Sequence, residues 1–198
     1  MNILRPAIVL TLLFALATGL AFPALITGIA QTLFPHQANG SLIRDASGRV
    51  VGSEIVGQNF TEARYFHPRP SAAGGGYDAA NSSGTNLGPT SDKLINGAEG
   101  FDGVKGLAEA YRKENGLAPD TELPADAVTR SASGLDPHIS PANAELQIVR
   151  VAKARRLAPD EVRRLVRAHT DDAFVGIFGE RAVNVLTLNR ALDSTNYR

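Results

Sequence analysis

An uninterrupted apolar stretch lies close to the amino terminus of this chain. No Asp, Glu, Lys or Arg occurs between Arg5 and Arg44, and Ala7 to Phe34 reads AIVLTLLFALATGLAFPALITGIAQTLF. As a helix this stretch would be about 42 Å long, whereas the hydrocarbon core of a bilayer is only about 30 Å thick. The sequence therefore predicts a transmembrane helix over residues 7–34, preceded by a short tail at residues 1–6 and followed by a separate domain at residues 35–198.

Two questions concern the fate and the shape of this stretch. A cleaved signal peptide would end in small residues, and Ala15-Leu16-Ala17 fits superficially, but the apolar run continues well beyond Ala17 and favours a retained anchor. Pro23 lies in the middle of the span, where it would kink the helix. Small residues either let a second helix approach or simply reflect the usual composition of membrane helices; they are Gly19, Ala21, Ala24 and Gly28.

Composition excludes several classes of protein. The 198 residues include 20 basic and 20 acidic side chains, so no net charge attracts nucleic acid. Because the chain has no cysteine, disulfides, thiolate metal sites and thiol nucleophiles are excluded. A basic run could contact phosphate, but no aromatic residues alternate with it, and such runs usually form the solvated side of helices. Its members are Arg150, Lys153, Arg155, Arg156, Arg163, Arg164 and Arg167.

The domain at residues 35–198 mixes strand and helix patterns without regular alternation. Leu42-Ile43 and Val50-Val51 flank a turn and predict a hairpin, which Ile55-Val56 could extend. Val183 to Leu188 resembles a strand that runs into a final helical turn. Together with the helices considered next, these patterns predict an α+β fold.

Three helices are predicted from periodicity and from end signals. The first begins near Val104 and stops at Asn115-Gly116; the second follows the N-cap Ser140, and the third starts at Pro159. On the second helix a buried stripe is expected at Ala144, Ile148, Val151 and Ala152, and the apolar residues off that stripe, Leu146, Val149 and Leu157, suggest cover on two sides. On the third helix Val162, Leu165, Val166 and His169 share one face.

Phe66 to Ser91, FHPRPSAAGGGYDAANSSGTNLGPTS, has no helical or strand period. A phosphate-binding loop would need a strand before the glycines and a suitably spaced lysine after them. Here Gly74 to Gly76 lead into Tyr77-Asp78, and neither requirement is met. The stretch is therefore predicted to be an irregular loop that binds no nucleotide.

The most reactive-looking string is SGLDPHISP, Ser133 to Pro141. Asp136 and His138 could ligate a metal, or act as acid and base beside Ser133 in a membrane-anchored hydrolase or binding protein. Two prolines and a glycine instead favour a rigid turn whose side chains bond backbone amides. A second cluster, His169 with Asp171 and Asp172, is more simply a helix end followed by an acidic turn.

Three strings together resemble the C subunits of the Kdp potassium-transporting ATPases, the KdpC family. They are YFHPRPSAAGGGYDAANSSGTNLGPTS from Tyr65, SGLDPHISPANAELQIVRVAKARRL from Ser133 and VNVLTLNRAL from Val183. Their order and spacing match the family, as do the apolar anchor and the hairpin GSLIRDASGRVVGSEIVGQNF. The resemblance covers nearly the whole chain.

The resemblance implies a bacterial inner-membrane complex that imports K⁺ at the cost of ATP. A P-type ATPase subunit would hydrolyse ATP, a channel-like subunit would select the ion, and this non-catalytic chain would assist assembly and activity. It also implies a cytoplasmic tail at residues 1–6, a single span at residues 7–34 and a periplasmic domain at residues 35–198. Lipid and the two larger subunits are the expected partners.

Two views of the family differ over the role of this subunit. In one it is a catalytic chaperone that raises the ATP affinity of the hydrolytic subunit through a transient contact with ATP; in the other it caps the channel-like subunit from outside. No cofactor, metal or catalytic residue is expected in the chain itself. The residues expected to shape the loops or to meet a partner are Asn81, Ser83, Asn86, Gly88, Ser133, Gly134, Asp136 and His138.

Overall fold

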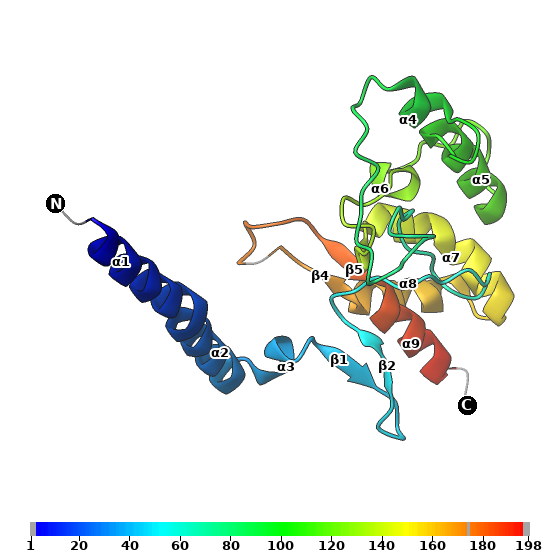
Figure 1. Ribbon diagram of the computed structural model, residues 1–198. Helices are drawn as coiled ribbons and strands as arrows, with labels where there is room; N and C mark the ends of the chain where they lie inside the picture. Colours follow the sequence, from blue (N-terminus) through cyan, green and yellow to red (C-terminus); the bar gives the residue numbers. More distant parts are fainter. Residues whose placement is uncertain (1–2, 174, 196–198) are drawn as a thin grey trace. The chain divides into compact units, whose positions relative to one another are not determined.

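The computed structural model describes residues 3–173 and 175–195. The chain divides into two compact units, Met1–Ser53 and Glu54–Arg198 (Figure 1). The first unit holds the apolar stretch and the predicted hairpin, and the second holds an α+β domain. The boundary therefore lies about twenty residues beyond the end of the anchor predicted from hydropathy.

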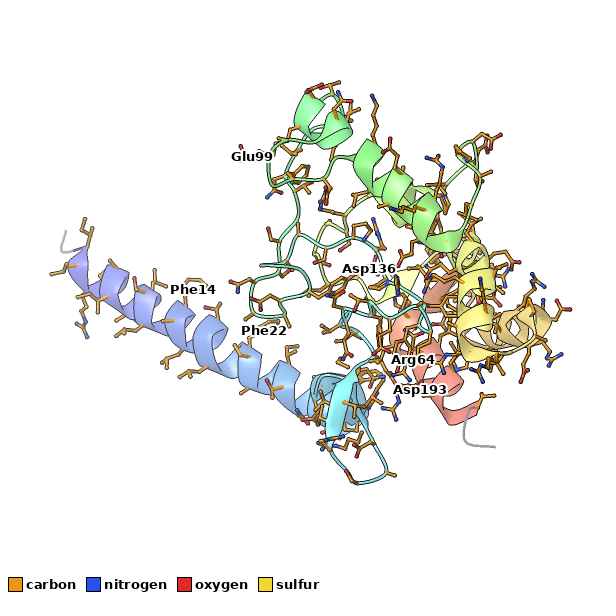
Figure 2. All side chains as sticks on the ribbon, turned by 90° about the vertical axis from the view of Figure 1, so that its right-hand side faces the viewer. Phe14, Phe22, Arg64, Glu99, Asp136 and Asp193 are labelled. Carbon is orange, nitrogen blue, oxygen red and sulfur yellow. The ribbon has the colours of Figure 1, made fainter. Side chains whose placement is uncertain are left out.

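The apolar stretch is helical from Leu4 to Leu33, and this helix is long and apolar enough to cross a membrane. It consists of α1 (Leu4–Leu16), a π-helical turn η1 (Ala17–Ala21) and α2 (Phe22–Leu33). None of these residues is buried within the protein, and Figure 2 shows Phe14 and Phe22 projecting outward from it. An apolar helix without protein cover is what a lipid environment requires.

The π-helical turn lies directly before Pro23, the residue for which a kink was predicted. The amide of Phe22 donates to the carbonyl of Ala17, five residues earlier. Proline has no amide hydrogen, and its ring would clash with the carbonyl four residues earlier. A π turn is a recognised way to open the hydrogen-bond ladder at such a point. The helix therefore continues past Pro23 as α2, with the adjustment made one turn earlier.

The predicted hairpin is confirmed. After the short helix α3 (Pro35–Ala38), β1 (Leu42–Arg44) pairs antiparallel with β2 (Val50–Ser53). The Asp45 carboxylate closes the turn, because one of its oxygens accepts hydrogen bonds from the Ser47 and Arg49 amides. Together with the Ser47 hydroxyl, these bonds hold the pKa of Asp45 below its ordinary value. Ile55 lies in a turn beyond β2, so the suggested extension of the strand by Ile55-Val56 is wrong.

The second unit is built on a small antiparallel sheet in the order β3-β5-β4. The strands are β3 (His138–Ile139), β4 (Thr170–Asp171) and β5 (Ala182–Asn184). The helices are α4 (Asp92–Asn96), α5 (Val104–Asn115), α6 (Ala125–Val128), α7 (Pro141–Arg155), α8 (Pro159–Ala168) and α9 (Val185–Thr195). Figure 1 shows α7, α8 and α9 gathered at the sheet, and the predicted α+β class is confirmed.

One core joins β3, β5, α7, α8 and α9 with Phe66 of the glycine-rich loop (residues 66–91). It is formed by Phe66, Ile139, Ala144, Ile148, Val151, Ala152, Val162, Val166, Val183, Val185, Leu188 and Leu192. The predicted helix ends are confirmed: Gly116 follows α5 in the left-handed conformation, and the Ser140 hydroxyl accepts from the Asn143 amide ahead of α7. The predicted stripes on α7 and α8 supply much of this core.

Two details of the prediction are wrong. The strand expected at Val183 to Leu188 ends at Asn184, and α9 begins at Val185 because the Asn184 side chain accepts a hydrogen bond from the Thr187 amide and caps the helix. Val149, expected under a second layer, is 63% exposed. The second side of α7 is instead occupied by buried amide side chains, those of Asn143 and Gln147.

Candidate functional site

The glycine-rich loop (residues 66–91) packs against the loop that leads into α7 (residues 131–140). The Ser83 amide donates to the carbonyl of Ser133 at 3.0 Å, and the Ser131 amide donates to the carbonyl of Pro70 at 3.1 Å. The Ser71 hydroxyl donates to the carbonyl of Gly134 at 2.7 Å. The structure therefore brings together two loops that lie about fifty to sixty residues apart in the sequence. They pack against each other as a single unit.

Gly134 sits at the centre of this contact. Its φ is +68°, and a Cβ atom placed on it would lie 2.7 Å from Ala73 Cβ, the Ala73 amide nitrogen and the Ser83 carbonyl oxygen. Only glycine tolerates both that backbone conformation and that close approach. Of the three consecutive glycines, by contrast, Gly75 has open space where a Cβ would point and no positive φ.

Asp136 holds the shape of the second loop. One carboxylate oxygen accepts from the His138 amide at 3.0 Å, and the other accepts from the Arg69 guanidinium at 2.9 Å. Asp136 is labelled in Figure 2. Tyr77 completes the contact, because its hydroxyl donates to the carbonyl of Arg69. Burial of this side chain raises the pKa of Tyr77. The predicted rigid turn is thus present, with the carboxylate joined to both loops.

The catalytic arrangement weighed for this string is not formed among the described residues. The Ser133 hydroxyl accepts from the amide of Leu135 at 3.1 Å, and no hydrogen bond between Ser133 and His138 is present in that part of the chain. His138 Nδ1 lies 3.8 Å from an Asp136 oxygen. No group of three or more His, Cys, Asp or Glu side chains that could hold a metal occurs within residues 3–173 and 175–195.

The remaining candidates of the glycine-rich loop lie apart from this contact. Asn81 bonds within its own loop, where its amide side chain donates to Asp78 and, more than any other group, lowers the pKa of that carboxyl. Asn86 is exposed with a left-handed φ of 52°, and the carbonyl of Gly88 accepts from the Ser91 amide. The structure therefore unites Ser83 with Ser133, Gly134, Asp136 and His138, but not Asn81, Asn86 or Gly88.

A second feature was missed by sequence reasoning: side chains of α7 and α9 form hydrogen bonds with the backbone of residues 63–67. The Asn189 side chain accepts from the Phe66 amide at 2.8 Å and donates to the Phe66 carbonyl at 2.9 Å. The Gln147 side chain forms the same pair with His67, at 2.7 Å and 3.1 Å. We call these two amide side chains the clamp.

Two arginines complete the attachment of this segment. Arg150 donates to the carbonyls of Ala63 and Tyr65, and Arg155 donates to the carbonyl of Arg64 and to Asp193. Figure 2 labels Arg64, in this segment, and Asp193 of α9, the two residues that Arg155 contacts. Both alternatives considered for the basic run are therefore wrong for Arg150 and Arg155, because their charges meet backbone carbonyls inside the fold. Burial lowers the pKa of Arg150.

Polar side chains also tie α5, α6 and α7 together. Asp126 accepts from the Ser140 amide, the Ser140 hydroxyl and the Asn143 side chain. The Tyr111 hydroxyl donates to the Asn143 side-chain oxygen at 2.8 Å, and burial raises the pKa of Tyr111. Because each of these buried groups has a partner, the network stabilises the fold and sets the position of α5.

A pocket of about 320 Å³ lies between the glycine-rich loop and α5. Its lining includes Phe60, Tyr77 and Tyr111 together with His67 and Glu114. His67 Nδ1 lies 2.9 Å from the Glu114 carboxylate, and that hydrogen bond lowers the pKa of Glu114. The His67 and Glu114 side chains of this pocket are thus bonded to each other, and the Tyr111 hydroxyl donates to Asn143.

The last candidate cluster is also separated by the fold. His169 ends α8, and its ring nitrogen Nδ1 lies 2.9 Å from the carbonyl of Leu165. Asp172 pairs with Arg181 across the base of the β4–β5 connection at 2.8 Å. The predicted helix end at His169 is confirmed, but the predicted acidic turn is wrong for Asp171, which lies in β4 and pairs with Ala182.

These observations define a class: a chain with an apolar helix suited to a membrane span, followed by an α+β domain whose loops and helices are joined by side-chain hydrogen bonds. Comparison with known proteins specifies the class further. The chain matches the KdpC family, described as "K+-transporting ATPase, c chain", over residues 4–194. It is 54% identical over 190 residues to a "Potassium-transporting ATPase KdpC subunit" of Mycobacterium tuberculosis, covering 96% of this chain and 97% of that protein.

A similar protein from Caulobacter vibrioides, with the same description, is 53% identical over 191 residues, covering 96% of this chain and 92% of that protein. Identity at this level over nearly the full length shows the family. The chain belongs to the KdpC family, the c chains of K⁺-transporting ATPases, and the resemblance seen in its loops and helices is confirmed.

Proposed function

We propose that this chain is the accessory subunit of an ATP-driven K⁺ import complex, in which it supports assembly and activity without being the catalytic subunit. The observation that carries the proposal is its 54% identity, over 96% of its length, to potassium-transporting ATPase KdpC subunits. The fold is consistent with a structural role, since its loops and helices are joined by internal polar contacts. Its partners are then the channel-like subunit and the P-type ATPase subunit.

We further propose that residues 1–6 are cytoplasmic, that the helix within residues 7–34 spans the inner membrane, and that residues 35–198 are periplasmic. The uncovered apolar helix Leu4–Leu33 supports a span. Because the chain has no cysteine, Ser47→Cys in the hairpin turn gives a unique label site. A membrane-impermeant maleimide should label it in intact spheroplasts, and labelling only after lysis would reverse the orientation.

Of the two roles considered for the domain, we favour a cap over the channel-like subunit. With the proposed orientation the domain at residues 35–198 lies on the opposite side of the membrane from ATP. A catalytic chaperone would act differently: it would lower the ATP concentration needed for half-maximal hydrolysis. Measuring the ATP dependence of hydrolysis with and without this subunit, in an assembled complex, distinguishes the two roles.

Co-purification tests the core of the proposal. The full chain is co-expressed with the two large subunits of its own complex, extracted in mild detergent and isolated through a tag on this chain. Both large subunits should be recovered with it in a constant ratio. Recovery of this chain alone, under conditions in which the large subunits are intact, would contradict the proposal.

The hydrolase hypothesis based on Ser133, Asp136 and His138 makes a different prediction. If Asp136 acts through Arg69 and the His138 amide, Asp136→Asn should lower thermal stability and complex recovery together. If Asp136 serves catalysis, the variant should keep its partners and its thermal stability and lose only the hydrolytic activity. Val149→Ser, on an exposed position of α7, is the control for both measurements.

A further inference from the structure

The connection between β4 and β5 exposes large apolar side chains at its tip. Val175 is 72% exposed, Ile177 77% and Phe178 69%. Other exposed large apolar residues of the domain lie singly, for example Val149 on α7 and Ile95 on α4. Single exposed apolar residues are ordinary, whereas several within four consecutive positions mark an interaction site. We call Val175, Ile177 and Phe178 the apolar tip.

The apolar tip is connected to the domain by a paired hairpin base, and we call the flanking charged positions within residues 171–181 the neck. Thr170 pairs with Val183 and Asp171 pairs with Ala182, so β4 and β5 remain bonded up to the start of the connection. Arg181 then pairs with Asp172 at 2.8 Å. Figure 1 shows the connection extending away from the helices of the domain. The exposure therefore arises from a formed hairpin base, not from a strand end that has opened.

The charges around the tip indicate what could cover it. Residues 171–181 carry Asp171, Asp172 and Glu180 against the single base Arg181, a formal charge of −2 from three acids and one base. An acidic neck would be repelled by the negative surface of anionic lipid. An apolar tip with an acidic neck is complementary to an apolar recess rimmed by Lys or Arg on a protein.

The hairpin of the first unit limits how far from the end of α2 the second unit can begin. Leu42 pairs with Ser53, so the twelve residues of the hairpin return to their starting point. Only residues 34–41, half of them in α3, then separate the end of α2 from that pair. Within the first unit, Ser53 consequently lies no more than on the order of 30 Å from Leu33. The domain is thus tied to structures at the membrane surface.

We propose that the apolar tip inserts into an apolar recess with a basic rim on the extramembrane face of a membrane-embedded partner subunit of the same complex. This inference rests on the proposed function, because it takes the partner to be a large subunit of the K⁺-transporting complex. The tip anchors the domain to that partner, and the acidic neck orients it against the rim.

Complex recovery tests the tip. The variant Val175→Ser/Ile177→Ser/Phe178→Ser, in the full chain co-expressed with the two large subunits, removes the apolar surface while leaving the core residues in place. Recovery of the large subunits should fall by roughly tenfold or more, because burial of even one large apolar side chain changes affinity by about that factor. Val149→Ser should leave recovery unchanged. Unchanged recovery with the tip variant would overturn the inference.

A label on the tip provides a measurement that does not depend on the triple variant. Because the chain has no cysteine, Ile177→Cys can carry one polarity-sensitive fluorophore, with Val149→Cys as the matched control. The labelled full chain is placed in nanodiscs containing anionic lipid, alone and then reconstituted with the large subunits. The tip label should shift to shorter wavelength only in the assembled complex, and the control label in neither sample.

Each other outcome has a defined meaning. A shift of the tip label in nanodiscs without the partner would identify the bilayer as the occupant and overturn the inference. No shift in an assembled complex would overturn it as well. Failure of the unmodified chain to assemble with the large subunits would contradict the proposed function instead, so the two failures can be told apart.

Discussion

Packing of the two loops requires both a left-handed backbone and a missing Cβ at Gly134. In Gly134→Ala the new methyl group would meet Ala73 and Ser83 at 2.7 Å while the backbone stays at φ +68°. We expect a loss of about 3 kcal/mol in the free energy of unfolding, from the left-handed conformation together with overpacking. Chemical denaturation of the detergent-solubilised chain measures it.

The matched control for that substitution is Gly75→Ala in the neighbouring loop. Its Cβ would meet nothing within 4 Å, and its backbone has no positive φ. The free energy of unfolding should change by less than about 0.5 kcal/mol. Equal losses for the two variants would show that the loops are not packed against each other at Gly134.

Glu114 makes a pH-dependent contribution to the stability of the folded domain. Its hydrogen bond to His67 lowers the folded-state pKa below the ordinary value of 4.5. A lowered carboxyl pKa stabilises the folded state above the unfolded value, and this stability is lost as the pH falls through the folded value. Relative to Glu114→Gln, the wild type should therefore begin to lose stability as the pH falls below about 5.5, one unit above the ordinary value, and should continue to lose it as the pH falls through the lowered folded-state pKa.

The size of this effect is limited because the Glu114 side chain is 42% exposed. We expect a difference below about 1 kcal/mol, as is usual for partly exposed ion pairs. Thermal unfolding across this pH range measures it, with Glu109→Gln on the same helix as the control. Parallel stability curves for the wild type and Glu114→Gln would contradict the prediction.

At the scale of elements, the clamp joins the segment at residues 63–67 to two helices. In Asn189→Ala the buried amide and carbonyl of Phe66 both lose their partner. Leaving buried polar groups unpaired costs about 1–3 kcal/mol each, so we expect the free energy of unfolding to fall by about 2–4 kcal/mol. Denaturant unfolding followed by circular dichroism measures the loss.

Asn96→Ala serves as the control for the clamp. This asparagine is exposed and bonds to Asp92 within its own short helix, so its removal should cost less than about 0.5 kcal/mol. If Asn189→Ala were as mild as Asn96→Ala, the segment at residues 63–67 would not depend on the clamp.

Elements with strong local signals could be predicted from the sequence. The ends of α5, α7 and α8 were found because Gly116, Ser140 and Pro159 act on the backbone within one turn. Val183 to Leu188 was misassigned because its β-branched residues suit a strand as well as a buried helix, and the Asn184 cap decides between them.

The site was predicted less completely for a physical reason. Turn chemistry at Asp136 is local and could be read from Asp-Pro-His. The clamp could not, because Gln147 meets His67 across 80 positions and Asn189 meets Phe66 across 123. An amide or guanidinium on a helix has the same appearance in the sequence whether it faces water or a distant backbone segment, so Arg150 and Arg155 were placed in the wrong environment.

At the scale of the whole molecule, the core of the domain uses no residue of the first unit. All its members lie between Phe66 and Leu192, and the boundary between the units follows Ser53. Residues 54–198 expressed alone should therefore be soluble and unfold in one cooperative transition, as single domains of this size usually do. Calorimetry together with far-ultraviolet circular dichroism measures this, and a gradual, non-cooperative melt would contradict it.

The clamp also bears on the order in which the domain can form. Phe66 and Asn189 are separated by 123 positions, and during synthesis the ribosome releases α9 long after the glycine-rich loop. Contacts between distant positions form slowly because a long loop must close first. The amide and carbonyl of Phe66 consequently remain without these partners until α9 has been synthesised. A nascent chain halted before Asn189 would hold the apolar helix and most other helices but could not close its core, so folding of the domain is coupled to the arrival of its last helix.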